Sequence, residues 1–368
     1  MQRVIVKRLH MANHNNVAQY LDQDELQNSE SVESQKKLIL KLIFIYLCPL
    51  VSVFVALFCG RYSLTFFEVL NALFFWLPIA DPVPKEVFVL VVEVRLPRAL
   101  AAAAVGGALA ASGAAFQGVF RNPLVNPGLL GVSNGAGFGA SLAIVMFGLG
   151  AAVYPMAFIF GIIAVLASYW IARVYKSTPA IMLILGGTIV SSVFASLISL
   201  TKYLANVETQ LPSIVYWLMG SLSGVTFSNF WAVLIMGIGV VILFGFGFRI
   251  DVLSMGDKEA RSLGLEVNRN KAAVISAATL ATAGAVCMAG VVGWIGLIVP
   301  HIGRMFVGSE NSRLIPASVA LGATLLVIVD TCSRCIWASE IPLGILTALI
   351  GAPFFVFLLK KTKGGGWR

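Results

Sequence analysis

Long hydrophobic runs separated by short polar connections fill most of this chain. They extend from about residue 38 to residue 361, and each ends at charged residues, glycine or proline. A helix needs about 20 apolar residues to cross the hydrocarbon core of a membrane, and most of these runs reach that length. The pattern therefore predicts an all-α polytopic membrane protein with about ten transmembrane helices.

The predicted spans differ in how clearly their ends are marked. The second starts after the Arg-Leu-Pro-Arg sequence at 95–98 and ends near Phe120, and the third starts close to Leu129. Residues 60–94 read as a loop with an amphipathic, interfacial segment, whereas 209–224 is too short and too broken to span. The other predicted spans are 38–59, 152–172, 180–204, 228–248, 271–292, 294–307, 314–333 and 341–359.

Three polar segments stand out from this pattern. Residues 1–37 mix basic and acidic side chains without an apolar period, which predicts a cytoplasmic tail that is disordered or weakly helical, and 362–368 are predicted to form a second cytoplasmic tail. The segment 249–270 predicts a helix capped at Asp257 and stopped near Gly264. The apolar side of this segment favours a surface for a partner protein, and a solvated loop is the alternative.

Two Asn-Pro steps, four residues apart, follow the second predicted span. Proline removes a backbone donor and disfavours helix in the residue before it. The chain is therefore predicted to make a sharp re-entry turn here rather than to continue as a helix. The residues of this turn are Asn122, Pro123, Asn126 and Pro127.

Four hydroxyl side chains line one face of the predicted span 180–204. Thr188, Ser192, Ser196 and Ser199 are separated by four, four and three residues, which is the spacing that puts side chains on one side of a helix. Such a row can line a polar pathway, or it can pack against another helix with each hydroxyl bonded to its own helix. The sequence leaves both interpretations open.

A short internal similarity relates the two halves of the chain. LAASGA at 109–114 recurs as LATAGA at 280–285, and under the ten-span topology the two copies run in opposite directions. The similarity predicts an inverted repeat of spans 2–5 with spans 7–10. Transporters commonly contain such repeats and bind their substrates at the interface between them.

The composition agrees with the hydropathy pattern and constrains the partners. Hydrophobic residues make up 58% of the chain, charged residues 12%, and the mean hydropathy is +0.90, so lipid must cover much of the apolar surface. The net charge of +9 does not indicate nucleic-acid binding, because the basic residues are scattered at the ends of apolar runs. With both termini cytoplasmic, only six of the 26 lysines and arginines lie outside, as the positive-inside rule requires: Arg61, Lys85, Arg95, Arg98, Lys202 and Arg334.

The sequence contains no pattern for covalent chemistry. It lacks the G-x-x-x-x-G-K-[ST], H-E-x-x-H and G-x-S-x-G motifs, so we expect neither an enzyme nor a cofactor. Cys332 and Cys335 form a C-x-x-C pair, but no second pair or histidine cluster completes a metal site, and whether the two thiols pair is left open. The centres of the spans are nearly free of charge, so energy for transport is expected to come from another chain.

Five segments closely resemble the permease family of iron-siderophore, haem and cobalamin ABC importers, which are type II importers. These segments are RLPR at 95–98, FRNPLVNPGLLGVSNGAG at 120–137, GDKEARSLGLEV at 256–267, GWIGLIVPHIGR at 293–304 and the EIPLGILTALIGAPFFVFLL ending. The resemblance covers about 38–361, and only the polar tail 1–37 departs from it.

The resemblance implies a transport subunit rather than an enzyme. It implies a homodimer with the pathway at its axis, two cytoplasmic ABC ATPase subunits, and a periplasmic or lipid-anchored substrate-binding protein. The expected protein is a multi-pass permease of the bacterial inner (plasma) membrane that imports an iron chelate, such as a siderophore complex or haem, or a related metal complex. Import of cobalamin or an oxyanion by the same architecture is the alternative, and a self-sufficient secondary carrier is a further one.

The resemblance also implies roles for particular residues. Arg95, Arg98 and Arg334 match the arginines that meet acidic residues of the binding protein, and headgroup anchoring is the other interpretation of the first two. The segment 249–270 matches the coupling helices that fit a cleft on the ATPase and tilt when the ATPase closes, which switches the pathway between outward-facing and inward-facing states. The coupling residues are expected to be Gly256, Asp257, Glu259, Ala260, Leu263 and Gly264.

Overall fold

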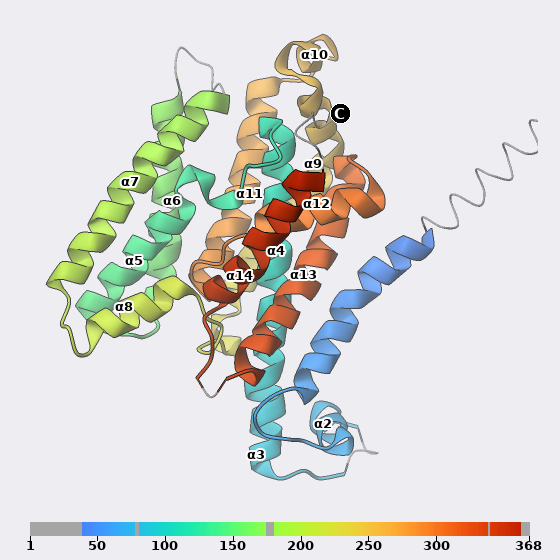
Figure 1. The fold of residues 1–368 in the computed structure, drawn as a ribbon, viewed down its shortest axis with the longest axis vertical. Coiled ribbons are helices and arrows are strands. Elements are labelled where there is room, and N and C mark those ends of the chain that lie inside the picture. Colours follow the sequence, from blue (N-terminus) through green and yellow to red (C-terminus); the bar gives the residue numbers. More distant parts are fainter. Residues whose placement is uncertain (1–38, 78–80, 174–179, 338, 362–368) are drawn as a thin grey trace, which may run out of the picture. The chain divides into compact units, whose positions relative to one another are not determined.

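The computed structural model describes residues 39–77, 81–173, 180–337 and 339–361. The predicted tails, 1–37 and 362–368, lie outside this part of the chain. Two compact units divide after Ile45, and the contacts described below all belong to the second unit, Tyr46–Arg368 (Figure 1). From the first unit, the structure describes only the opening residues of the helix Ile39–Phe58.

Seven helices of the described chain are long and apolar enough to cross a membrane, and three more are apolar but shorter. Together they confirm an all-helical polytopic fold with about ten spans. The long helices are Ile39–Phe58, Lys85–Phe120, α6 (Val153–Ala172), α7 (Ala180–Leu204), α9 (Trp231–Met255), α11 (Val267–Ala289) and α13 (Asn311–Cys335). The shorter ones are α5 (Val132–Phe147), α12 (Ile295–Val307) and α14 (Leu343–Lys361), and α8 (Gln210–Met219) fills the segment predicted to be too short to span.

The second span begins earlier than predicted. The sequence predicts a loop at 60–94, but α3 (Lys85–Phe88) and a π-helical segment (Val89–Arg95) run directly into α4 (Leu96–Phe120). Pro97 stands inside this continuous helix, and a proline cannot donate the backbone hydrogen bond of a regular turn. The wider π-helical turns directly before it accommodate that loss. The proline therefore interrupts the hydrogen bonding of the helix without starting or ending it.

The segment expected at a membrane interface contains one short capped helix, α2 (Phe66–Leu73). The Glu68 carboxylate accepts the backbone N–H of Thr65 at 2.7 Å, and the Thr65 hydroxyl accepts the backbone N–H of Glu68 at 3.4 Å. This capping box starts the helix, and the backbone hydrogen bond from Thr65 lowers the pKa of the Glu68 carboxyl. α2 and α10 (Asp257–Ser262) stand at opposite ends of the second unit (Figure 1), which we call the α2 end and the α10 end.

The polar segment 249–270 contains parts of three helices, and α10 lies where the sequence predicts a helix between Asp257 and Gly264. The first residues of the segment complete α9, which stops at Gly256, where a φ of +136° favours glycine. α10 follows at once, and α11 begins at Val267. The helical period continues past the predicted end of the sixth span because Ile250 and Leu253 are buried in the bundle.

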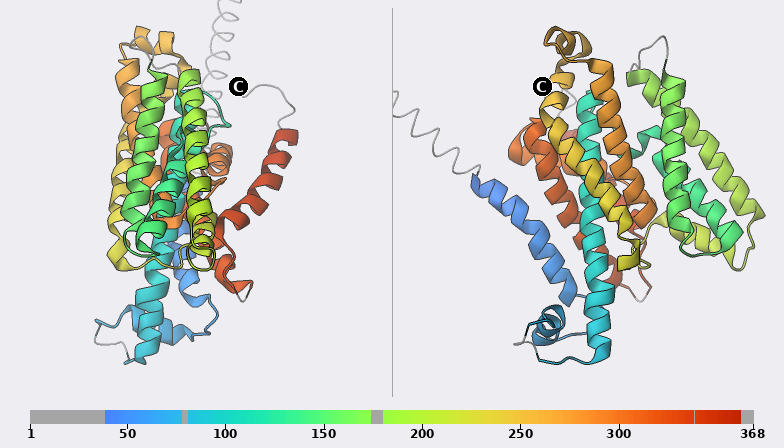
Figure 2. Two further views of the ribbon diagram at one scale, coloured as in Figure 1. Left: turned by 90° about the vertical axis from the view of Figure 1, so that its left-hand side faces the viewer. Right: turned by 180° about the vertical axis from the view of Figure 1, so that it is seen from behind.

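α4 lies at the centre of the second unit. It contacts α9, α11, α12 and α13, which surround it in both sets of views (Figure 1 and Figure 2). Small residues make this possible, because glycines let neighbouring backbones approach closely. A Cβ atom added at Gly106 would overlap the backbone oxygen of Gly322 on α13, and one added at Gly113 would overlap that of Gly296 on α12.

α4 and α11 carry the two copies of the internal similarity. They run in opposite directions (Figure 1), and the Ser112 hydroxyl of α4 donates to the Ala278 carbonyl of α11 at 3.0 Å. Each helix is followed by an irregular segment and then by a short helix, which is α5 with 16 residues or α12 with 13. This arrangement is consistent with the predicted inverted repeat, which stays a prediction.

We expect Gly113→Ala to destabilise the protein and Gly237→Ala to leave it unchanged or slightly more stable. Both glycines lie in long apolar helices, but an added Cβ meets the Gly296 backbone at Gly113 and nothing within 4 Å at Gly237. Overpacking of this kind costs about 1–3 kcal/mol, whereas alanine is favoured over glycine inside a helix by about 1 kcal/mol. Thermal unfolding of both purified variants in detergent measures the difference, and equal midpoints would contradict the close contact of α4 with α12.

Candidate functional site

Three arginines from two distant parts of the sequence meet near the α2 end with two carboxylates. This arginine cluster consists of Arg95, Arg98, Arg334, Asp330 and Glu340. Nε of Arg98 lies 3.0 Å from both oxygens of Asp330, while its Nη1 and Nη2 donate to the two oxygens of Glu340 at 2.8 and 3.0 Å. Such charge-assisted, two-pronged bonds fix geometry as well as adding energy. Arg98 thus joins α4 to α13 and to the segment before α14.

Arg95 and Arg334 bind backbone carbonyls at the end of the first helix. Arg95 donates to the Leu57 carbonyl at 2.7 Å and to the Tyr62 carbonyl at 2.6 Å, and Arg334 donates to the Ala56 carbonyl at 2.8 Å. The last carbonyls of a helix have no partner within it and carry partial negative charge. The two guanidinium groups therefore satisfy the C-terminal end of that helix and hold it against α4 and α13.

The structure brings the three predicted docking arginines together, and it also buries them. The exposed fractions of Arg95, Arg98 and Arg334 are 3%, 6% and 7%, so none of them is a free charge at a membrane mouth. Buried guanidinium groups need acceptors within the protein. Sequence reasoning missed Asp330 and Glu340 as these acceptors because they follow Arg98 by 232 and 242 residues.

A cavity of about 520 Å³, which we call the repeat cavity, lies between the predicted repeats. Its wall comes from α4, the re-entry turn, α5 and α7 on one side, and from α11 and the segment before α12 on the other. None of the lining residues that the structure describes is charged. The polar lining side chains are Asn126, Ser133, Thr188, Ser191, Ser192 and Thr282.

The hydroxyl row on α7 contributes only in part to the repeat cavity. Thr188 and Ser192 line it, whereas Ser196 and Ser199 are not among its lining residues. Every hydroxyl of the row also donates to a carbonyl of its own helix at 2.8 to 3.0 Å. All four hydroxyls are therefore bonded within their own helix, and Thr188 and Ser192 also line the repeat cavity.

The chain turns sharply after α4. Arg121 adopts a left-handed conformation, with φ of 52°, and ends the helix. The side chain of Asn122 then accepts the backbone N–H two residues further on at 2.9 Å. Asn126 precedes a short 3-10 helix, Pro127–Leu130, whose first residue packs against Gly296 of α12. Both residues of this second Asn-Pro step line the repeat cavity.

Gln117 is a positioning residue that sequence reasoning missed. It is buried in α4, and its amide nitrogen lies 3.3 to 3.4 Å from the carbonyl oxygens of Val125 in the turn and of Gly296 and Leu297 in α12. Its amide oxygen accepts a hydrogen bond from Arg304 at 2.6 Å. One side chain thus fixes the re-entry turn against α12. The signal in the sequence was a lone amide in a helix of small residues.

α10 is fastened to the bundle by an ion pair. Lys271 of α11, whose side chain is 5% exposed, bonds both carboxylate oxygens of Asp257 at 2.7 and 2.8 Å. The prediction that Asp257 caps the helix is therefore wrong, because it is the first residue of α10 and its carboxylate binds Lys271 instead. Ala260 packs inward, Leu263 is exposed, and Gly264, with φ of +81°, follows where the helix ends.

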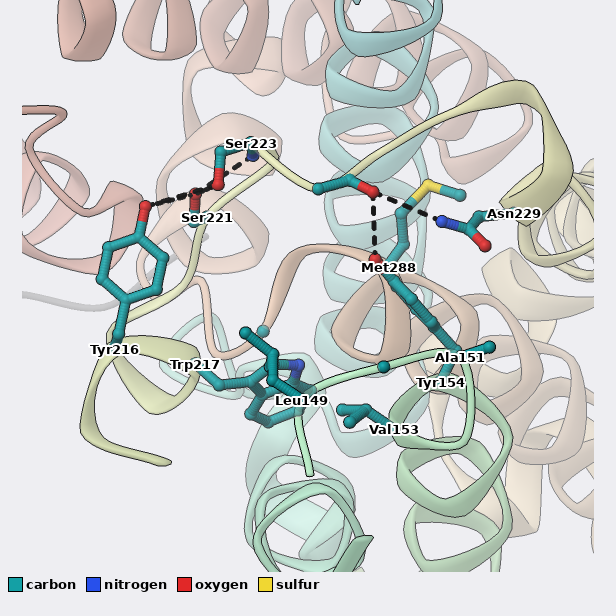
Figure 3. Close-up of a pocket in the computed structure, with 13 residues that line it drawn as sticks. Leu149, Ala151, Val153, Tyr154, Tyr216, Trp217, Ser221, Ser223, Asn229 and Met288 are labelled. Atoms are coloured by element: carbon teal, nitrogen blue, oxygen red, sulfur yellow. Dashed lines mark hydrogen bonds between the residues drawn. The ribbon is translucent and has the colours of Figure 1, made fainter. Parts of the chain in front are cut away.

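A second pocket, of about 350 Å³, was not predicted from the sequence (Figure 3). Tyr154 of α6 and Tyr216 and Trp217 of α8 supply its aromatic walls. On its rim the Tyr216 hydroxyl donates to Ser221 at 3.1 Å, and Ser221 donates to Ser223 at 3.0 Å. In the sequence these serines look like an ordinary polar connection, so only the fold shows that they border a pocket.

Comparison with known proteins assigns this arrangement to one family. Residues 47–361 match the FecCD transport family. The chain is 38% identical, over 89% of its length and 97% of the relative's, to the molybdate import system permease protein MolB of Haemophilus influenzae. It is 39% identical over 78% of its length to the cobalamin import system permease protein BtuC of Halobacterium salinarum, covering 77% of that protein. A probable iron chelatin transport system permease protein of Helicobacter pylori is 35% identical, over 75% of this chain and 84% of the relative.

A comparison of folds gives the same result. The structure superposes with a TM-score of 0.76 and 36% identity on a solved structure described as an inward-facing conformation of an ABC transporter assigned to the metal-chelate type. The superposition covers 87% of this chain and 98% of that one. The chain therefore belongs to the FecCD transport family and is the non-catalytic transmembrane permease subunit of an ABC importer.

Proposed function

We propose that this permease imports an iron chelate, such as a siderophore complex or haem, or a related metal complex. The observation that carries the proposal is the repeat cavity, which is lined by hydroxyls, an amide and apolar groups but, within the described lining, by no charged side chain. A chelate shields the charge of its metal, whereas burying a bare ion away from counter-charges is costly. The relatives named for cobalamin and iron chelatin import support the same substrate class.

Molybdate or another oxyanion is the second candidate. One relative is named for molybdate import and aligns along nearly all of its own length. The side chains of Asn126 and Ser191 in the repeat cavity can donate hydrogen bonds to an oxyanion. The uncharged lining favours the chelate, because an oxyanion would be held more firmly by a cationic side chain.

The assembly that we propose is a homodimer in the bacterial plasma membrane with the pathway at its axis. Two ATPase subunits bind at the α10 end, which faces the cytoplasm together with both termini, and a substrate-binding protein docks at the α2 end. The bias of lysine and arginine toward the α10 end supports this orientation. The arginine cluster is the proposed docking region. Because its arginines are buried and already bonded, docking would replace one of their present partners rather than pair a free arginine.

Coupling to ATP hydrolysis is proposed to act through α10. Glu259 and Leu263 are exposed and can contact a cleft on the ATPase, while the pair of Asp257 and Lys271 joins α10 to α11. α11 carries Thr282 in the wall of the repeat cavity. A tilt of α10 would therefore reach the cavity through one continuous helix, which supports alternating access as the transport mechanism.

Proteoliposomes that contain this permease, its ATPase and its binding protein are expected to accumulate a radiolabelled ferric siderophore only when ATP is present on the α10 side. Haem, cobalamin and molybdate are supplied in parallel at equal concentration. Preferential accumulation of molybdate would overturn the chelate proposal in favour of the oxyanion. Uptake by the permease alone on an ion gradient would show a self-sufficient carrier instead.

We expect Asp257→Asn to lower ATP-driven uptake several-fold, because it leaves Lys271, whose side chain is 5% exposed, without its counter-charge. The matched control is Glu310→Gln. It removes an ion pair with Arg313 in which both side chains are about half exposed, and exposed pairs contribute about 0–1 kcal/mol. Uptake and ATP hydrolysis by the assembled transporter are measured together. Equal activity of the two variants would contradict the coupling role of the pair of Asp257 and Lys271.

A further inference from the structure

The two carboxylates that bind Arg98 differ in how firmly they are held. Asp330 lies within α13 and its side chain is 2% exposed, whereas Glu340 lies in the connection before α14 and its side chain is 26% exposed. Asp330 accepts from Nε and Nη2 of Arg98, and Glu340 accepts from Nη1 and Nη2. One edge of the guanidinium is therefore covered by a side chain that already reaches solvent.

The arginine cluster carries one more positive charge than negative. The described hydrogen bonds of Arg95 all go to backbone carbonyls. Nε of Arg334 is buried without a hydrogen-bond partner in the described chain and lies 3.6 Å from Asp330. Arg61, which is exposed, donates to the Trp337 carbonyl at 3.3 Å and adds a positive charge at the rim. A further carboxylate arriving at this surface would be stabilised by charge complementarity.

We propose that Glu340 occupies, in the undocked permease, the position that a carboxylate of the binding protein takes on docking. This inference rests on the proposed docking at the α2 end. An incoming aspartate or glutamate replaces Glu340 on Nη1 and Nη2 of Arg98, while Asp330 stays in place and holds the guanidinium. The exchange keeps the number of ion pairs constant and returns Glu340 to water. A buried arginine can thus bind a partner without ever losing its counter-charge, which would be costly.

The exchange would also act on the start of α14. Ile341, which follows Glu340, is held by Ser333: the Ser333 hydroxyl donates to the Ile341 carbonyl at 2.5 Å, and the Ser333 carbonyl accepts the Ile341 N–H at 3.2 Å. In the first turn of α14, Gly344 lies so close to Val291 that an added Cβ would be 3.0 Å from the Val291 carbonyl oxygen. Val291 lines the repeat cavity. Release of Glu340 on docking therefore affects a segment that abuts the cavity wall.

The test is the affinity of the permease in nanodiscs for its substrate-free binding protein. Glu340→Gln is expected to lower the Kd about threefold to tenfold at low ionic strength, a change of at most about 1.4 kcal/mol, because the neutral amide competes less well for Arg98. Glu208→Gln is the matched control. It makes the same change at an exposed glutamate between α7 and α8 that forms no ion pair in the described chain, and it is expected to leave the Kd unchanged.

Unchanged or weaker binding by Glu340→Gln would overturn the proposal, provided that Arg98 variants weaken binding. Arg98→Gln removes the docking cation, and Arg98→Lys keeps the charge but cannot form two-pronged bonds, so the second variant serves if the first does not fold. Thermal unfolding of each variant shows whether it is folded. If folded Arg98 and Glu340 variants both bind like the wild type, the docking region lies elsewhere, and the proposed role of the arginine cluster fails instead.

Discussion

Close backbone contact along α4 is the constraint on which the rest of the structure depends. In lipid the hydrophobic effect does little to drive helices together, so close packing and internal hydrogen bonds must hold the bundle. Gly106 and Gly113 bring α13 and α12 against the backbone of α4, and Ser112 bonds α11. With these neighbours fixed, the arginine cluster, the repeat cavity and the attachment of α10 all have definite positions.

Arg95, Arg98, Arg334 and Gln117 are buried in the bundle and each has hydrogen-bond partners inside the protein, as a membrane environment demands. Arg98 has two carboxylates, Arg95 and Arg334 take the open carbonyls of the first helix, and Gln117 bridges the re-entry turn and α12. Each of these side chains connects two or three elements of the fold rather than bonding only within its own helix. These side chains stabilise the packing of the helices, so a change of their hydrogen-bond partners would also change that packing.

The proposed alternating access changes which end of the pathway is open, so the connections between the sites matter as much as the sites. The arginine cluster lies near the α2 end, where Arg95 bonds Leu57 and Tyr62, and α10 stands at the opposite end of the second unit (Figure 1). α11 links α10 to the repeat cavity, and the start of α14 links the arginine cluster to the same cavity. The proposed ATPase and binding protein would thus both act on the walls of the repeat cavity, the first from the α10 end through α11 and the second from the α2 end through the start of α14.

The sequence by itself determined the class of protein, about ten spans, the sharp turn after α4 and the family, because long apolar runs, prolines, glycines and motifs are local signals. It misplaced the start of the second span by putting it after Pro97, whereas Pro97 stands inside the helix. The π-helical segment before Pro97 accommodates the backbone hydrogen bond that the proline cannot donate. Only the tertiary structure decided that Asp330 and Glu340 neutralise Arg98, that Lys271 holds Asp257, and that two of the four α7 hydroxyls face a cavity. These contacts depend on which helices pack side by side. The choice of neighbours follows from the steric fit of small residues along whole helices, and the hydropathy pattern does not contain this information.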